Sequence, residues 1–113
     1  MKPERQDYAV DPGPSPGTWL FRGVMRLDSP EAYARAFAPV LASLDQVPEI
    51  SLDLSQVVFL NSSGIRAFAD VLVLAREKRR MVRVFGSASV PWQKKLASSL
   101  HGLFPEFEMR IDR

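Results

Sequence analysis

The chain has 113 residues, of which 46% are hydrophobic and 25% charged, a composition typical of one soluble globular domain. Its 15 Lys and Arg nearly balance 13 Asp and Glu, and the net charge of +2 gives no argument for nucleic acid as a partner. Cys is absent and His101 is the single histidine, which excludes disulfides, thiolate nucleophiles, and Cys-ligated or multi-His metal sites. We therefore expect no metal and no cofactor.

The apolar segments are too short to place the chain in a membrane. Residues 1–5 lead into Gln6, Asp7 and Tyr8 rather than into the apolar stretch of a signal peptide. The longest helical apolar run, around residues 71–75, is far shorter than the roughly 20 residues that span a bilayer. We expect a cytoplasmic protein without membrane insertion.

A hairpin and a helix are expected in the N-terminal part. Residues 6–10 predict a short edge strand, residues 11–17 a Pro- and Gly-rich turn that no central strand tolerates, and residues 18–24 the partner strand. Ser29 as N-cap and Pro30 at the first helical position predict a helix. Its apolar stripe comprises Tyr33, Phe37, Val40, Leu41 and Leu44. Pro39 inside this stripe predicts a kink or a break.

Strands and helices alternate in the rest of the chain. Residues 49–54 alternate apolar and polar side chains, as in a strand that buries one face, and residues 57–60 predict its buried continuation. A helix is expected from about Ser62 to residue 80, with Ile65, Phe68, Leu72 and Ala75 on its apolar face. The remaining elements are a strand at 81–85, a polar turn at 86–89, a helix at 91–103 with Trp92, Leu96, Leu100 and Leu103 on its apolar stripe, and a strand at 107–111.

This order of elements predicts an α/β fold in a single domain over residues 1–113. Strands separated by helices favour a mixed sheet with right-handed crossovers between its parallel strands. Residues 1–17 are expected to form the N-terminal edge strand and the Pro/Gly-rich turn. The alternation in residues 49–55 indicates that the helices cover mainly one face of the sheet, since a strand buried on both faces would be apolar throughout.

Asn61, Ser62 and Ser63 stand where a predicted strand passes into a helix. The first N–H groups of a helix have no intrahelical partner and its dipole is positive there, so an anion is favoured. A hydroxyl at this point caps the helix, and a phosphate on it would lie in a favourable field. Ligand sites gather past the carboxyl ends of parallel strands, so we expect these residues to lie near Ser87, Ser89 and Trp92.

Leu52-Asp53-Leu54-Ser55 followed by Val58-Phe59-Leu60-Asn61-Ser62-Ser63-Gly64-Ile65 forms an apolar-Asp-Leu strand that opens a helix through Asn-Ser-Ser-Gly. This motif resembles the signature of STAS domains, the family that includes anti-sigma-factor antagonists, and departs from it at Asn61. The segment from Phe21 to Leu27 stands where the family carries its Gly-x-Leu-Asp-Leu turn. The Asn-Ser-Ser-Gly form and Val90-Pro91-Trp92-Gln93 are similar to a subset of small bacterial STAS-like regulators.

The resemblance implies a STAS-like fold and partner switching, a form of signal transduction that regulates transcription. The implied partner is a histidine-kinase-like anti-sigma factor or serine kinase, or the cognate phosphatase. Phosphorylation of the first Ser of the motif, here Ser62, abolishes binding in such a system, since the added charge opposes close contact with a partner. The implied site neighbours are Asn61, Ser63, Gly64, Asp53 and Arg26. The expected partner surface comprises Met25, Arg66, Ser87, Ser89 and Trp92.

Two departures from the family remove negative charge near Ser62. Asn61 replaces the family's acidic residue before the serine, and Arg26 replaces the acidic residue of its Gly-x-Leu-Asp-Leu turn. Bound Mg²⁺ is therefore less favoured, while a phosphate is better tolerated and a phosphorylated state is expected to be longer-lived.

Plainer interpretations stand beside each of these roles. Ser62 acts as an ordinary N-cap, Ser63 is structural, Gly64 permits close packing, Trp92 belongs to the core, and Asp53 either orients the serine turn or is simply solvated. The cations at 76, 78, 79 and 80 complement a helix dipole rather than bind nucleic acid. No base accompanies a serine and no nucleotide-binding loop is present, so an enzyme is not expected. A constitutive STAS adaptor or scaffold and a small-ligand-binding STAS module remain as alternatives to the phosphorylated switch.

Overall fold

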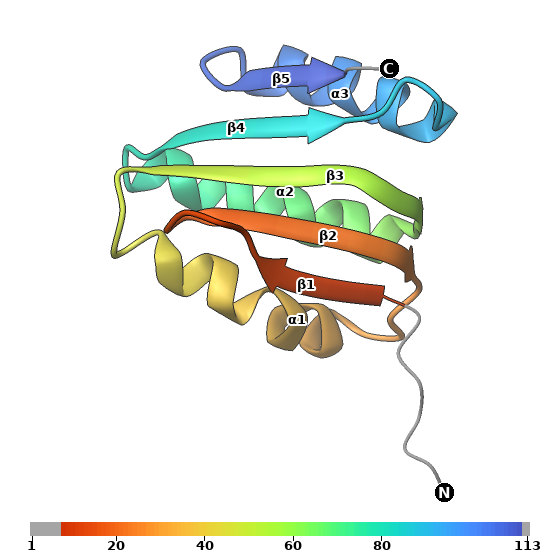
Figure 1. Ribbon diagram of the computed structural model, residues 1–113, viewed down its shortest axis with the longest axis horizontal. Coiled ribbons are helices and arrows are strands. Elements are labelled where there is room, and N and C mark those ends of the chain that lie inside the picture. Colours follow the sequence, from red (N-terminus) through yellow and green to blue (C-terminus); the bar gives the residue numbers. More distant parts are fainter. Residues whose placement is uncertain (1–7, 112–113) are drawn as a thin grey trace, which may run out of the picture.

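The computed structural model describes residues 8–111. These residues form five strands and three helices: β1 (Tyr8–Pro12), β2 (Thr18–Met25), α1 (Pro30–Ser43), β3 (Glu49–Leu60), α2 (Ser62–Glu77), β4 (Met81–Gly86), α3 (Pro91–Leu103) and β5 (Glu108–Ile111) (Figure 1). One sheet contains the strands in the order β1-β2-β3-β4-β5. Strand β1 runs antiparallel to β2, and the other neighbours are parallel. The predicted α/β fold with a mixed sheet is thus confirmed.

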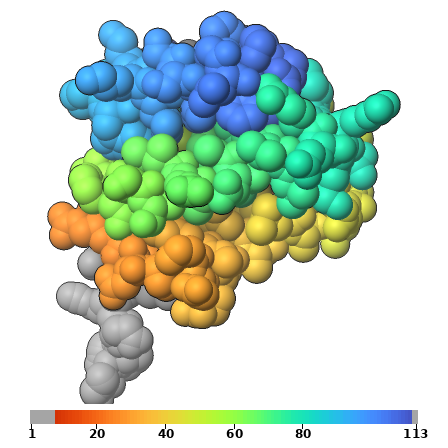
Figure 2. Space-filling view, turned by 180° about the vertical axis from the view of Figure 1, so that it is seen from behind, coloured from red at the N-terminus to blue at the C-terminus, as the bar shows by residue number. Residues whose placement is uncertain are grey.

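All three helices pack on one face of the sheet, as the alternating strand predicted (Figure 1). Viewed from behind, α1, α2 and α3 cover the sheet from its N-terminal to its C-terminal edge (Figure 2). Three aromatic rings join these layers: the ring of Phe21 in β2 meets Phe37 of α1 at 5.5 Å and Phe68 of α2 at 6.5 Å, both edge to face. All three side chains are at most 3% exposed, so they form the centre of the core.

The opposite face of the sheet carries charged side chains in place of helices. In β4, Arg83 lies between two buried valines, and its Nε is 3.0 Å from Glu49 Oε2 and 3.2 Å from Glu108 Oε1. Exposed ion pairs of this kind contribute about 0 to 1 kcal/mol, so they keep the face hydrated more than they stabilise the fold. Within residues 8–111, no helix has the length and hydrophobicity needed to cross a membrane.

Helix α1 continues through Pro39 from Pro30 to Ser43, so of the predicted kink or break the break does not occur. Pro39 is exposed, and the carbonyl that its missing N–H would have paired with can bond to water instead. The N-terminal hairpin is confirmed for the described residues, although β1 extends through Pro12, which faces Trp19 at the edge of the sheet. The predicted start at Gln6 lies outside the described residues.

Strand β3 is longer than its neighbour β4, and this difference exposes its end. It pairs with β4 over Glu49–Asp53 but with β2 as far as Leu60, across two register shifts. Of the predicted buried continuation at residues 57–60, Val57 and Leu60 are buried, whereas Val58 is 64% exposed and Phe59 is 40% exposed. The apolar stripes also reach less far than expected, since Leu103 at the end of α3 is 64% exposed.

Candidate functional site

Helix α2 is capped by Asn61 and not by Ser62. The backbone of Asn61 is extended, with φ −77° and ψ 174°, and its Oδ1 accepts a hydrogen bond of 2.9 Å from Gly64 N. Ser62 is the first helical residue, and its side chain is exposed. The expected cap therefore lies one residue earlier, because Asn and Ser are nearly equivalent caps and longer-range contacts select Asn61.

Those contacts connect Asn61 to β2 and α1. Tyr33 of α1 donates from its hydroxyl to Asn61 Oδ1 at 2.6 Å, and Asn61 Nδ2 donates to Leu27 O at 3.2 Å. The backbone N of Asn61 donates to Met25 O at 3.2 Å. Tyr33 is fully buried, and this burial raises the pKa of its hydroxyl, which keeps the group protonated as a donor. One side chain thus fixes the start of α2 to the end of β2.

The contact with Leu27 O favours an amide over a carboxylate at position 61. An Asp side chain would still accept from Gly64 N and from Tyr33, but its second oxygen would face the Leu27 carbonyl oxygen in place of an N–H donor. Two oxygen acceptors at the 3.2 Å that now joins Asn61 Nδ2 to Leu27 O would repel each other. Asn61 therefore has a structural role in addition to any effect on the charge near Ser62.

Ser62 and Ser63 present both their hydroxyls and their backbone amides at the start of α2. Both side chains are exposed, and among residues 8–111 the amides of these two residues have no protein acceptor. Gly64 is buried directly behind them. A Cβ at Gly64 would lie 2.7 Å from Tyr33 Oη and closer still to the Leu60 side chain, so the predicted close packing of the helix start is confirmed.

Exposed apolar side chains flank the two serines. Val58 and Phe59 precede the turn, and Ile65, at 36% exposure, lies in the first turn of α2 rather than on its buried face as predicted. The Arg26 guanidinium lies over the Phe59 ring at 5.1 Å from its centroid. Met25 is 1% exposed, so its predicted place on the partner surface is wrong: it is the last residue of β2 and points into the core.

The loop after β4 lies beside this end of β3, as the strand order predicted. Trp92 is half-buried against the core, and its Nε1 donates to Val58 O at 2.9 Å. Ser89 is exposed and Ser87 half-buried, and their hydroxyls are 2.7 Å apart. The prediction that Ser87, Ser89 and Trp92 lie at the same edge of the sheet as the serine turn is thus confirmed.

Sequence reasoning missed Gln93, which holds that loop in place. Its side chain is 2% exposed, its Nε2 donates to Leu54 O at 2.6 Å and to Val57 O at 2.8 Å, and its Oε1 accepts from Ser87 N at 2.7 Å. The amide thus replaces the pairing that β4 would supply if it were as long as β3. The sequence signal for this role is that β3 is longer than β4, which leaves carbonyls of β3 without a partner strand.

Two further residues were predicted for the site: Asp53 lies within β3, apart from the serine turn, and Arg66 lies on α2 beside it. Asp53 Oδ1 accepts from Ser55 N at 2.9 Å and from Ser55 Oγ at 2.6 Å, so its carboxylate is bound within β3 and does not orient the turn. Arg66 is exposed on α2, one helical turn after Ser62. This i, i+4 spacing brings the two side chains to the same face of the helix.

The cations at the end of α2 are engaged in structural contacts. Arg76 Nε lies 2.6 Å from Glu106 Oε2 and its guanidinium stacks on Phe104, while Lys78 pairs with Asp45 at 2.7 Å. Each pair lowers the pKa of its carboxyl group, chiefly through the hydrogen bond from the cation. Arg76 and Lys78 thus connect α2 to its neighbours, and the predicted complement to the helix dipole stays a prediction.

The chain matches no protein-family model and no curated protein. Its fold matches a chain of the crystal structure of the diguanylate cyclase SiaD in complex with its activator SiaC from Pseudomonas aeruginosa, with a TM-score of 0.71. The match covers 98% of this chain and 96% of that chain at 21% sequence identity. At this identity the similarity concerns the fold, a small α/β domain that also occurs in a complex between proteins.

Proposed function

We propose that the chain is a non-enzymatic protein-interaction module of a regulatory system, a STAS-like partner switch with Ser62 as its phospho-acceptor. The observation that carries this proposal is the exposed Ser62-Ser63 pair, whose backbone amides have no acceptor among residues 8–111, next to exposed apolar side chains. The similar fold comes from a complex between an enzyme and its activator, which supports a regulatory interaction for this chain as well.

The apolar side chains beside the serines have the properties of an interface centre. Val58, Phe59 and Ile65 are exposed within eight residues of chain, although water disfavours such a concentration. Aromatic and Arg side chains are enriched at protein interfaces, and here Arg26 lies over Phe59. A protein partner that covers this end of β3 would bury the three apolar groups and leave the serines at the rim.

A phosphate on Ser62 would be stabilised by the helix and would oppose the partner. The free amides of Ser62 and Ser63 are donors for it, and the first turn of α2 contains no acidic residue. Arg66 follows at the i+4 position. A phosphate carries about −1.5 to −2 charges near pH 7, so its desolvation at an apolar interface is costly. Binding is therefore expected in the unphosphorylated state.

Partner binding can be tested with tagged protein expressed in its native cells. We expect wild-type protein to retain a partner that Ser62→Asp and Phe59→Ser release, with affinity reduced at least about tenfold. Ser99→Asp, which places the same charge on an exposed serine of α3, is the matched control and should retain the partner. Equal retention by all four proteins would contradict the proposed surface.

Intact-mass measurement after coexpression with candidate kinases tests the phosphorylation. A single phosphate mapped to Ser62 and absent from Ser62→Ala supports the switch. A stable complex that never carries a phosphate supports the constitutive adaptor instead, and a copurified small molecule without a protein partner supports a ligand-binding module.

A further inference from the structure

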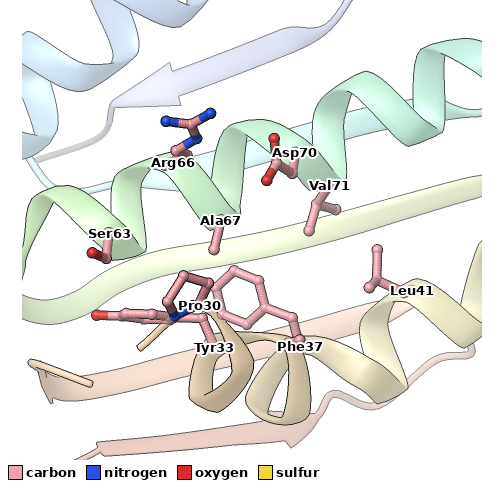
Figure 3. A pocket seen from close by; sticks show the side chains of 10 residues that line it. Pro30, Tyr33, Phe37, Leu41, Ser63, Arg66, Ala67, Asp70 and Val71 are labelled. Atoms are coloured by element: carbon pink, nitrogen blue, oxygen red, sulfur yellow. The ribbon is translucent and has the colours of Figure 1, made fainter. Parts of the chain in front are cut away.

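A groove of about 490 Å³ separates α1 from α2 on the helical face of the molecule (Figure 3). Its floor is apolar and is formed by the aromatic rings of Tyr33 and Phe37 together with Val71. Figure 3 shows Ala67 and Val71 directed from α2 toward α1, with Arg66 and Asp70 along the outer side of α2. Ser63 lies at the end of the groove that adjoins the serine turn.

The two rims of the groove differ in charge. On the α2 rim, Arg66 and Asp70 are four residues apart and exposed, and neither forms an ion pair with any other residue in the range 8–111. The α1 side is lined only by uncharged residues, with Pro30 and Ala34 at one end and Leu41 at the other. An occupant can therefore make apolar contacts along α1 while it places polar groups of both signs against α2.

We propose that this groove binds one amphipathic helix of a protein partner. Its lining runs from Pro30 to Leu41 in α1 and from Ser63 to Val71 in α2, which at 1.5 Å per residue is about 12 to 16 Å, or two to three helical turns. Apolar side chains at i, i+3/i+4 and i+7 of the bound helix fill the floor. The proposal rests on the proposed function, since the helix belongs to the partner that Ser62 controls.

The helix dipoles assign a direction to the bound helix, and Arg66 and Asp70 then assign the order of its charged residues. Antiparallel alignment with α2 brings the negative carboxyl end of the bound helix to the positive start of α2. A basic residue of the bound helix then faces Asp70, and an acidic residue four positions later faces Arg66. In this orientation a phosphate on Ser62 meets the carboxyl end of the bound helix and repels it. The same phosphate also competes for Arg66, so modification of the turn weakens binding in the groove.

A helix-stapled, fluorescein-labelled peptide of about 14 residues tests the groove directly, because a short free helix would be mostly unfolded. The peptide carries leucines in one stripe, with Lys at i and Glu at i+4 beside it. We expect binding by fluorescence anisotropy to weaken at least about tenfold in Ala34→Trp, which fills the groove. The matched control is Ala38→Trp, an exposed position of α1 outside the groove, which should bind as the wild type does.

The pairing of Arg66 and Asp70 with the bound helix is tested by exchanging Lys and Glu in the peptide. The wild type should prefer the Lys-then-Glu peptide over the Glu-then-Lys peptide by about three- to tenfold, and Arg66→Glu combined with Asp70→Lys should reverse this preference. No peptide binding, or equal binding by Ala34→Trp and Ala38→Trp, overturns the proposal. A small molecule that copurifies with the wild type but not with Ala34→Trp also overturns it.

The partner isolated through the serine surface separates the two proposals. Release by Ser62→Asp and Phe59→Ser but full retention by Ala34→Trp leaves the proposed function standing and refutes the groove. Peptide binding that follows the groove variants, without any partner lost on Ser62→Asp, refutes the switch and supports the groove.

Discussion

Replacement of Asn61 by Ala should destabilise the fold far more than replacement of Ser62 by Ala. Asn61→Ala removes the bond that caps Gly64 N, the donor to Leu27 O, and the shorter of two acceptor contacts of the buried Tyr33 hydroxyl, which keeps Met25 O at 3.1 Å. A lost cap costs about 1 kcal/mol, the bond to Leu27 O about 0.5 to 1.5 kcal/mol, and the change of acceptor at Tyr33 at most about 1.5 kcal/mol, which gives about 1.5 to 4 kcal/mol in total. Ser62→Ala removes an exposed hydroxyl at the first helical position and should change stability by less than about 0.5 kcal/mol.

Urea titration followed by far-ultraviolet circular dichroism measures both free energies of unfolding. Asn61→Asp is the informative third variant, because it keeps the cap and the Tyr33 bond and loses the donor to Leu27 O. Its stability should fall between those of the wild type and Asn61→Ala. If Asn61→Ala and Ser62→Ala lost equal stability, the assignment of the cap to Asn61 would be refuted.

Three further variants or conditions test the fold. Phe68→Ala should cost about 3 to 5 kcal/mol by denaturant titration, because the ring is 1% exposed; a loss below about 1 kcal/mol would contradict its place in the core. Gly64→Ala should cost about 1 to 3 kcal/mol despite better helix propensity, since its Cβ overlaps neighbouring side chains; greater stability would show that the helix start has room. Stability should fall below about pH 4.5, since ion pairs lower the folded-state pKa values of Asp45 and Glu106 from 3.8 and 4.5; thermal unfolding that is unchanged between pH 6 and 3 would disagree.

The fold was predictable because its signals are local. The alternation in β3, the Ser29-Pro30 helix start and the turns between elements each depend on neighbouring residues, and together they predicted the order of the elements and the single helical layer. The resemblance of Asn61-Ser62-Ser63-Gly64 to a known motif predicted the position of the candidate site. Its phosphorylation and its partner stay predictions.

The errors arose where distant residues decide a local choice. Asn61 and Ser62 are both good caps, and Tyr33 and Leu27, far away in the sequence, select Asn61. Gln93 reads as a surface residue of an amphipathic helix, but the short β4 leaves carbonyls of β3 for it to bind. The groove between α1 and α2 depends on how two helices pack, which their separate sequence patterns do not specify.

The overhang of β3 beyond β4 determines how a partner can attach to this end of the sheet. An uncovered strand edge ordinarily accepts an extended peptide as an additional strand through main-chain hydrogen bonds. Here the carbonyls of Leu54, Val57 and Val58 already accept hydrogen bonds from the side chains of Gln93 and Trp92. An added strand would find these three acceptors already occupied, so an extended peptide gains fewer main-chain hydrogen bonds at this edge than at an ordinary open strand.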